Sequence, residues 1–472
     1  MFLLSRQELG IHGGLLMLAE PIGKDCPKAA EILRSHGLTP FRAILAPELF
    51  RQAHPRESPP KTILIPEVVF WLMATAALAG GSMAGCISAF WAPLHAAIPW
   101  LPLEAVQEEA FCIARGALPI RFFLRLFAMV VARFSERFPQ AYRWKGRRLL
   151  GIDGMDTDLP RHPHLAKVLP PPQNQHGPRA RPQGRLVGLV GLWDGVCYAF
   201  RWTSLKVSEQ VSARKLLAHL GPADLLLCDR NFPDKETFAG VLARGADFLF
   251  HLPSNRFLKQ HRQPLPAGRR DEWCIRIPLP AALCQQYPTV GQELTVRILQ
   301  YQIPGFRPSW LVTSLRDAQQ FRYDELVGLY HERWRQETFH REWKHSLELS
   351  NLRSHKAAGL LKEVLVQLTI NNVVRWIMAE AAQPTLRPVD LKFLEAKRLI
   401  LASLPPMAAA PTALLPALYR ALVQQIARQR IRVRPGRSYP RKWDARSRPK
   451  GHGKTAKPAR LPAPSDGSHA SI

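Results

Sequence analysis

Four polar side chains of different chemistry recur at helical spacing near residue 340. They are Tyr330, Arg333, Glu337 and Lys344. Steps of three, four and seven residues, at about 100° per residue, place them within roughly a 60° arc of one α-helical face. Such a stripe is either a solvated face with ion pairs one turn apart, or a site in which a carboxylate binds metal beside cations that bind phosphate.

Two aspartates follow short apolar runs elsewhere in the chain. Asp153 ends the run 149–152, and Asp229 ends the run 225–228. Short apolar runs closed by turn residues are typical of buried strands. A carboxylate at the carboxyl end of such a strand lies at the sheet edge where α/β proteins commonly bind ligands. Both aspartates are therefore candidates for the same site.

Other acids compete with these carboxylates. Glu332 and Glu342 lie off the helical stripe. Asp194 precedes a glycine between two strand-like runs, and a hairpin turn explains it without chemistry. Asp156 and Asp158 are nearer rivals of the first aspartate, but we expect them past the strand, in the turn.

The two aspartates and the helical glutamate form a three-carboxylate set. Hard divalent cations prefer anionic oxygen ligands, and two such ions neutralise a phosphodiester while water or a 3′-hydroxyl attacks in line. We therefore expect Asp153, Asp229 and Glu337 to bind two Mg²⁺ ions, for which Mn²⁺ can substitute. Arg333 and Lys344 would then face phosphates.

The order of these motifs resembles that of the DDE transposases of the insertion-sequence-four family. The family signature Tyr-x2-Arg-x3-Glu-x6-Lys is met in full by residues 330–344, and its first acidic motif, Asp-Gly after a strand, matches Asp153-Gly154. The second motif, Asp-Arg-Gly-Phe, appears as Asp229-Arg230-Asn231-Phe232. Asn231 replaces the glycine, and asparagine also tolerates positive φ. The resemblance covers roughly residues 146–380.

This resemblance implies a ribonuclease-H-like α/β fold with a β-rich insertion between the second aspartate and the glutamate. It also implies a DNA transposase that hydrolyses phosphodiesters at transposon ends and transfers the strands into target DNA, by cut-and-paste through a hairpinned end. Tyr330, Arg333 and Lys344 would grip phosphates near the cut, and Arg230 is a further candidate for phosphate binding. Trp273, in the insertion, is a candidate for stacking on an exposed base, although a core position is the commoner fate of a tryptophan.

Two alternative functions stay open on the sequence alone. A nuclease of the same fold would cut DNA without joining it, and strand-transfer products would separate the two activities. A non-catalytic DNA-binding protein descended from a transposase would show no metal-dependent cleavage. A protein that merely binds DNA gains nothing from concentrating acids near phosphates, so the intact carboxylate set argues against this alternative.

The composition favours DNA as the partner. The chain has 472 residues, 46% of them hydrophobic, and a formal net charge of +28, which favours nucleic acid over an anionic membrane surface. Its seven cysteines are scattered and contain no CxxC pair, so we expect reduced thiols and neither a disulfide scaffold nor structural zinc. We expect a cytoplasmic, nucleoid-associated protein that binds transposon ends and target DNA as a homodimer, without a membrane.

The chain divides into four predicted segments. They are a helical N-terminal DNA-binding domain at 1–145, the catalytic domain at 146–383 with its insertion at about 253–308, a small helical C-terminal region at 384–428 and a disordered basic tail at 429–472. The uncharged stretch 68–103 is interrupted by glycines and prolines, which favours two buried helices over a membrane span. Residues 428–460 contain thirteen Lys or Arg and one Asp, which predicts disorder until the tail meets a polyanion.

Overall fold

The structure is a computed structural model that describes residues 44–54, 64–97, 106–174, 177–178, 180–253, 257, 260–302, 307–382 and 386–432. By internal contacts the chain forms one unit over Met1–Ile431 and another over Arg432–Ile472. The start of the predicted DNA-binding domain and nearly all of the predicted basic tail lie outside the described residues.

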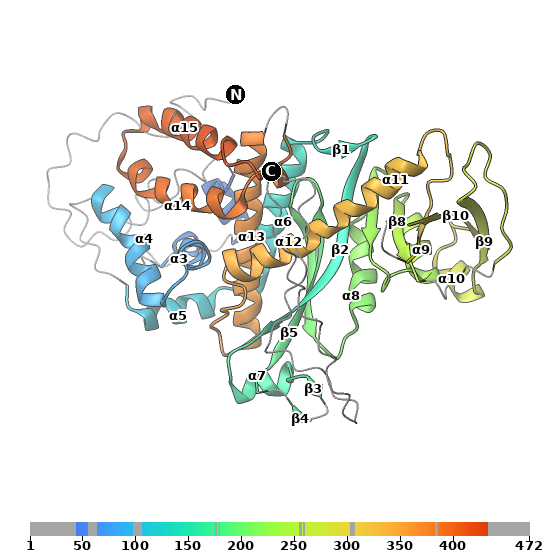
Figure 1. Ribbon diagram of the computed structural model, residues 1–472. Coiled ribbons are helices and arrows are strands. Elements are labelled where there is room, and N and C mark those ends of the chain that lie inside the picture. Colours follow the sequence, from blue (N-terminus) through green and yellow to red (C-terminus); the bar gives the residue numbers. More distant parts are fainter. Residues whose placement is uncertain are drawn as a thin grey trace, which may run out of the picture. The chain divides into compact units, whose positions relative to one another are not determined.

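One mixed sheet organises the first unit (Figure 1). The order of its first five strands is β6 (Cys197–Ser204), β5 (Gln183–Gly191), β2 (Arg147–Asp158), β7 (Asp224–Cys228) and β8 (Asp247–Leu252). β5 is antiparallel to both of its neighbours, whereas β7 is parallel to β2 and β8 is parallel to β7. This mixed sheet, with helices before and after it in the chain, confirms the predicted α/β class.

The insertion after β8 extends the same sheet. It contains β9 (Glu272–Pro278), α10 (Ala281–Gln286) and β10 (Glu293–Tyr301), and β11 (Ser309–Thr313) follows. β11 pairs antiparallel with both β8 and β10, so it returns the chain to the main sheet. A buried ion pair between Arg297 of β10 and Glu272 of β9 joins the two outer strands. The insertion is therefore built onto one edge of the sheet.

The two faces of the sheet belong to two hydrophobic cores. Successive strand side chains point to opposite faces, and the strand residues divide accordingly. Leu149, Leu225, Leu227 and Leu249 belong to the first core, and Leu150, Leu226, Phe248 and Phe250 belong to the second. α8 (Glu209–Leu216) and α9 (Lys235–Leu242) contribute to the second core. The first core holds the remaining long helices.

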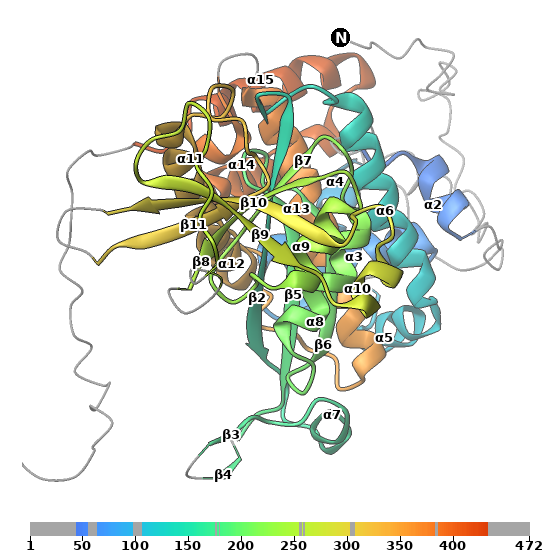
Figure 2. The same ribbon diagram turned by 90° about the vertical axis from the view of Figure 1, so that its right-hand side faces the viewer.

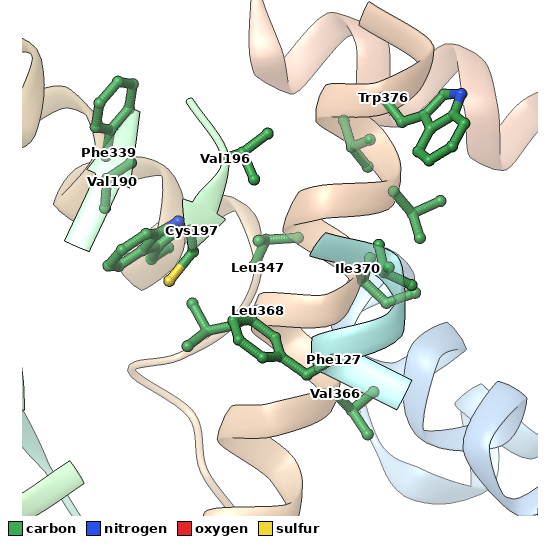
Figure 3. Packing of buried hydrophobic residues seen from close by; sticks show 14 of the residues in the cluster. Phe127, Val190, Val196, Cys197, Phe339, Leu347, Val366, Leu368, Ile370 and Trp376 are labelled. Carbon is green, nitrogen blue, oxygen red and sulfur yellow. The ribbon is translucent and has the colours of Figure 1, made fainter. Parts of the chain in front are cut away.

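α13 (Ala357–Ala382) is the central helix of the first core and is buried along almost its whole length. Figure 3 shows Phe127, from α6 (Ile120–Arg137), beside Leu368 and Val366 of α13. α14 (Phe393–Ala409) and α15 (Leu415–Ala427) also contact α13. Both helices lie within the small helical region predicted at 384–428.

The uncharged stretch forms two helices, α3 (Pro66–Ala79) and α4 (Met83–Ala97). α3 is buried nearly all round, as expected, but several described side chains in the first half of α4 are exposed. No single helix among the described residues is long and apolar enough to cross a membrane; α3 and Met83–Trp91 pass that test only as a pair bent by 111°. Two shorter helices precede α6 in this region, α2 (Pro47–Ala53) and α5 (Glu108–Ala117).

The chain between β2 and β5 contains a short helix and a small hairpin. They are α7 (Pro163–Val168), β3 (Gln173–Asn174) and β4 (Gly177–Pro178). Figure 2 shows them projecting beyond β2 and β5.

Candidate active site

Asp153 lies inside β2 rather than at its end, which corrects the sequence prediction. The parallel ladder between β2 and β7 stops at Gly151. β2 nevertheless continues to Asp158, because it stays paired with β5, where Asp153 opposes Gly188. Asp153 therefore stands just beyond the point where the ladder with β7 ends, and Asp229 directly follows β7.

The rival aspartates have structural partners. Asp156 and Asp158, expected in a turn, are the last acids of β2 itself. Asp156 accepts a hydrogen bond from Arg185 Nε at 2.7 Å, and Asp158 accepts one from the Gln183 amide. Asp194 is buried in the turn between β5 and β6, where it accepts hydrogen bonds from a main-chain N–H and a tyrosine hydroxyl. Hairpin formation accounts for Asp194, as predicted.

Asp153, Asp229 and His251 lie on one face of three neighbouring strands. The alternation of side chains puts each of them on the face whose leucines belong to the first core. That core also contains Tyr330, together with Phe339 and Trp343 from the segment that follows it. The three polar side chains therefore face the segment that carries the predicted glutamate.

That segment is not the single regular α-helix that the spacing predicted. It consists of α11 (Tyr323–Tyr330), the 3₁₀ turn η3 (His331–Trp334), α12 (Arg335–Arg341) and the π-helical η4 (Glu342–Ser346). A 3₁₀ turn rotates further per residue than an α-helix and a π-helix rotates less. The 60° stripe is therefore broken, and its four residues lie in four different segments.

Tyr330 and Arg333 lie beside the two aspartates. Arg333 interacts electrostatically with Asp153 and with Tyr330, and its Nε is buried without a hydrogen-bond partner among the described residues. Tyr330 is 6% exposed, and its ring centroid lies 6.0 Å from that of His251. Burial raises the pKa of Tyr330, so the phenol stays protonated.

Glu337 and Lys344 occupy different surroundings. Glu337 is exposed on α12, and the preceding Gln336 is buried against Gly151, two residues before Asp153 on β2. Burial, and then the charge of Lys344, lowers the pKa of His340 to about 4. The structure thus places the helix of Glu337 against the strand of Asp153, while Lys344 lies beside His340.

The two aspartates are close enough to affect each other. Burial, followed by the charge of Glu209, raises the pKa of Asp153 to about 7; Asp229 adds to this rise, and an N–H donated by Gly154 at 2.9 Å opposes it. Asp229 accepts the N–H of Asn231 at 2.9 Å. Asn231 is not among the described residues with positive φ, so this hydrogen-bonded turn, rather than tolerance of positive φ, accounts for the asparagine.

Glu209 is a carboxylate of this site that sequence reasoning missed. It is the first residue of α8, after the N-cap Ser208, and a Cβ at Gly154 would overlap its Oε1 and lie 3.0 Å from its carboxyl carbon. Burial, and then Asp229, raises its pKa. A side chain at position 154 would therefore have to displace the Glu209 carboxyl group, and the glycine of the Asp-Gly motif was the one sequence signal of this close approach.

Arg230 and Trp273, the two other residues predicted to contact DNA, lie in different parts of the structure. Arg230 lies near His251, whose pKa is lowered by burial and then by that guanidinium. Trp273 is 6% exposed in the second core, with the guanidinium of Arg262 4.1 Å from its ring centroid. Base stacking would require this ring to leave the core. Trp273 therefore occupies the core position that was the alternative to base stacking. Trp334, in η3, is 52% exposed.

The donor chemistry at Asp153 and Asp229 fits a divalent cation. The repulsion and desolvation that raise the pKa of Asp153 are relieved when a cation binds the two carboxylates. Within the described residues, no group of three or more His, Cys, Asp or Glu side chains is arranged to hold a metal ion. Asp153 and Asp229 are therefore two oxygen donors available to a cation on this face, and α12 carries the predicted third.

We expect Gly151→Ala to disturb the packing of α12 on β2. An added Cβ would overlap the Gln336 amide and lie 2.9 Å from a Leu192 methyl carbon, and overpacking of this kind costs about 1–3 kcal/mol. Urea unfolding should show this loss of free energy, and DNA cleavage should slow because Glu337 moves with Gln336. Gly116→Ala, on α5 with no atom within 4 Å of the added carbon, is the control and should be neutral or slightly stabilising. Wild-type stability of the Gly151 variant would contradict the packing.

The residues of this site lie within a segment that matches a known protein family. Residues 144–373 match a family model described as "Transposase DDE domain". The transposase InsG for insertion sequence element IS4 of Escherichia coli (strain K12) is 25% identical over 340 residues, which cover 71% of this chain and 76% of that protein. A cryo-EM structure of the piggyBac transposase synaptic complex with hairpin DNA is 11% identical and covers 89% of this chain and 88% of that chain. Its TM-score of 0.39 is too low to carry an inference.

Proposed function

We propose that this chain is a DDE transposase of the insertion-sequence-four type, which cuts the phosphodiester backbone at the ends of an insertion element and joins the freed 3′ ends to target DNA. The match of residues 144–373 to the transposase DDE domain and the similarity to the IS4 transposase support the proposal. The observation that carries the proposal is the shared face of Asp153 and Asp229, on which the segment with Arg333 and Glu337 packs. This arrangement supports acids and cations acting on one phosphate.

Asp153, Asp229 and Glu337 would hold two Mg²⁺ ions. When bound, such ions activate the attacking hydroxyl and stabilise the leaving oxygen of an in-line displacement. The aspartates already share a face, whereas Glu337 lies exposed on α12. We propose that DNA binding brings Glu337 toward Asp153 by a rearrangement of the η3–α12–η4 segment, whose mixture of helix types permits a change of register.

The cationic residues would hold the DNA backbone. The guanidinium of Arg333 interacts with Asp153 in this structure and suits two-pronged contact with a phosphate. Arg230, next to Asp229, would add a second cation, and Lys344, in η4 beside His340, would add a third. Tyr330 is protonated and would donate its hydroxyl to a phosphate oxygen.

A transposition reaction acts on two transposon ends, so we propose a homodimer in the DNA complex, with one active site for each end. The net charge of +28 supports binding to both transposon ends and target DNA. We propose that the protein works on the nucleoid in the bacterial cytoplasm, an assignment that the scattered cysteines support.

The decisive experiment incubates the protein and Mg²⁺ with a labelled duplex of the element's terminal inverted repeat and a supercoiled target plasmid. Nicked ends, hairpin ends and joined products are then resolved on gels. Joined products support transposition, whereas cleavage without joining would support the nuclease alternative. A protein that binds the duplex but leaves it uncut would be a non-catalytic descendant.

Truncation after residue 432 should weaken DNA binding without changing sequence choice. The removed tail is rich in Lys and Arg, and each phosphate contact contributes roughly 0.9 to the slope of log affinity against log salt on duplex DNA. The truncated protein should therefore show a shallower slope for both repeat and unrelated duplexes, and the ratio of the two affinities should stay constant. An unchanged slope would show that the tail does not contact phosphates.

A further inference from the structure

His251 stands next to Asp229 on the neighbouring strand. β8 runs parallel to β7, and their ladder ends with Cys228 opposite Phe250. The next residue on each strand is Asp229 and His251, and neighbouring strands lie about 4.8 Å apart. Both side chains project from the same face of the sheet, as the alternation of the two cores requires.

The imidazole and four neighbouring side chains, Tyr330, Asp229, Arg230 and Arg333, form a cluster. The ring lies 6.0 Å from the Tyr330 ring, centroid to centroid, at 37°. The charged groups that act on it are Arg230, Asp229 and Arg333. It therefore lies between the strand-end aspartate and the segment that carries the family signature.

Two buried polar atoms in this cluster have no hydrogen-bond partner in the described part of the chain. They are His251 Nδ1 and Arg333 Nε. A buried polar atom left unpaired costs about 1–3 kcal/mol, so such atoms in native proteins call for an explanation such as an absent ligand. They come from β8 and η3, two elements that are distant in the sequence.

We propose that His251 is a phosphate-positioning residue that donates a hydrogen bond to a backbone phosphate of the bound DNA, next to the phosphate contact of Arg333. This inference rests on the proposed function. An anionic oxygen suits the guanidinium and an imidazole N–H together, and the contact would hold the strand against Asp229. The packing of the ring on Tyr330 fixes the direction of that hydrogen bond.

Two substitutions separate the hydrogen bond from the packing. His251→Phe keeps a ring against Tyr330 and removes both nitrogens, whereas His251→Gln keeps an N–H donor and removes the ring. His261→Phe, at an exposed position of the insertion, is the matched control. Losing one hydrogen bond to a charged group corresponds to roughly a 10- to 100-fold weaker interaction, so the Phe variant should bind end duplex or cleave it more slowly by about that factor, and Gln should restore part of the loss.

The contact is located by neutralising phosphates one at a time. Duplexes carrying a single methylphosphonate near the cut are bound without metal, by fluorescence anisotropy, and cleaved with Mg²⁺. One methylphosphonate should weaken binding by wild type but add nothing to the loss in His251→Phe, the coupling expected of a direct contact. Purely additive losses at every position, or equal losses in the Phe and Gln variants with a lowered unfolding midpoint, would overturn the proposal. The binding arm does not require cleavage, so absence of cleavage by wild type would count against the proposed function alone.

Discussion

Asp153→Asn, Asp229→Asn and Glu337→Gln are each expected to reduce Mg²⁺-dependent DNA cleavage to background while leaving binding of the end duplex nearly intact. Metal coordination needs anionic oxygens, and a neutral amide of the same shape supplies none. Folding has no such need, because Asp153 forms no ion pair among the described residues and Glu337 is exposed. Cleavage of a labelled duplex and its binding in the absence of metal measure the two effects separately.

Asp156→Asn is the matched control for this prediction. Asp156 lies on the same strand as Asp153. Unlike Asp153, it forms an ion pair, in which its Oδ1 lies 2.7 Å from Arg185 Nε. Its loss should affect stability slightly, since partly exposed ion pairs contribute about 0–1 kcal/mol, and should leave cleavage in place. An inactive Asp156 variant beside an active Asp153 variant would reverse the assignment of the first metal ligand.

The same Asp153 variant should be more stable than wild type when metal is absent and the pH is high. The pKa of Asp153 is about 7 in the folded protein and about 3.9 in an unfolded chain. The folded state therefore holds the proton more tightly. Between about pH 4 and pH 7 the unfolded chain loses this proton while the folded protein keeps it, which lowers the free energy of unfolding by an amount on the order of a few kcal/mol. Asparagine does not ionise, so the variant does not lose stability in this way as the pH rises. The unfolding midpoint of Asp153→Asn should thus exceed that of wild type at pH 8, and the two should converge toward pH 4.

Local patterns in the sequence predicted the sheet well. The apolar run before Asp229 forms β7, and the two runs around Asp194-Gly195 form the β5–β6 hairpin. Gly195 has φ of 74°, the conformation that such a turn requires. Period and turn chemistry act over a few residues, so they can be read from the chain directly.

The length of β2 could not be predicted in the same way. Its second half is held by pairing with β5, in which Asp156 opposes Arg185 across the whole intervening loop. Pairing between distant segments overrides the local signal that Asp153-Gly154 ends a strand. Long-range pairing of this kind also brought His251 beside Asp229, and helix packing brought Glu209 against Gly154; neither residue belongs to a recognisable motif.

The irregular signature segment likewise depends on tertiary contacts. Glu342, the first residue of η4, forms an ion pair with Arg375, which is buried on α13. Arg335, the first residue of α12, pairs with both Glu332 and Asp390. These ion pairs hold successive turns of the segment against different neighbours. The segment therefore does not form one continuous α-helix. The spacing of the signature identifies candidate residues, but it could not predict the 3₁₀ and π turns between them.

Arg333→Ala and Lys344→Ala are expected to retain Mg²⁺ binding and to slow hairpin formation and end joining more than the first nick. Hydrolysis of the first strand needs mainly metal and water, whereas bringing a 3′-hydroxyl onto the opposite strand requires bent DNA held in a fixed position, where small misplacements cost orders of magnitude in rate. Arg333 should have the larger effect, because it interacts with Asp153, whereas Lys344, in η4, lies beside His340 of α12.

A time course on the labelled end duplex, resolving nicked, hairpin and fully cleaved products, measures each step for each variant. Arg333→Lys should rescue poorly, since an ammonium cannot reproduce a two-pronged guanidinium contact with phosphate. Arg341→Ala, at an exposed position of α12, is the control and should leave the ratio of products unchanged. If Arg333→Ala instead slowed every step equally or lost metal binding, the guanidinium would be supporting the carboxylates rather than the DNA, and the phosphate grip proposed for this segment would have to be given up.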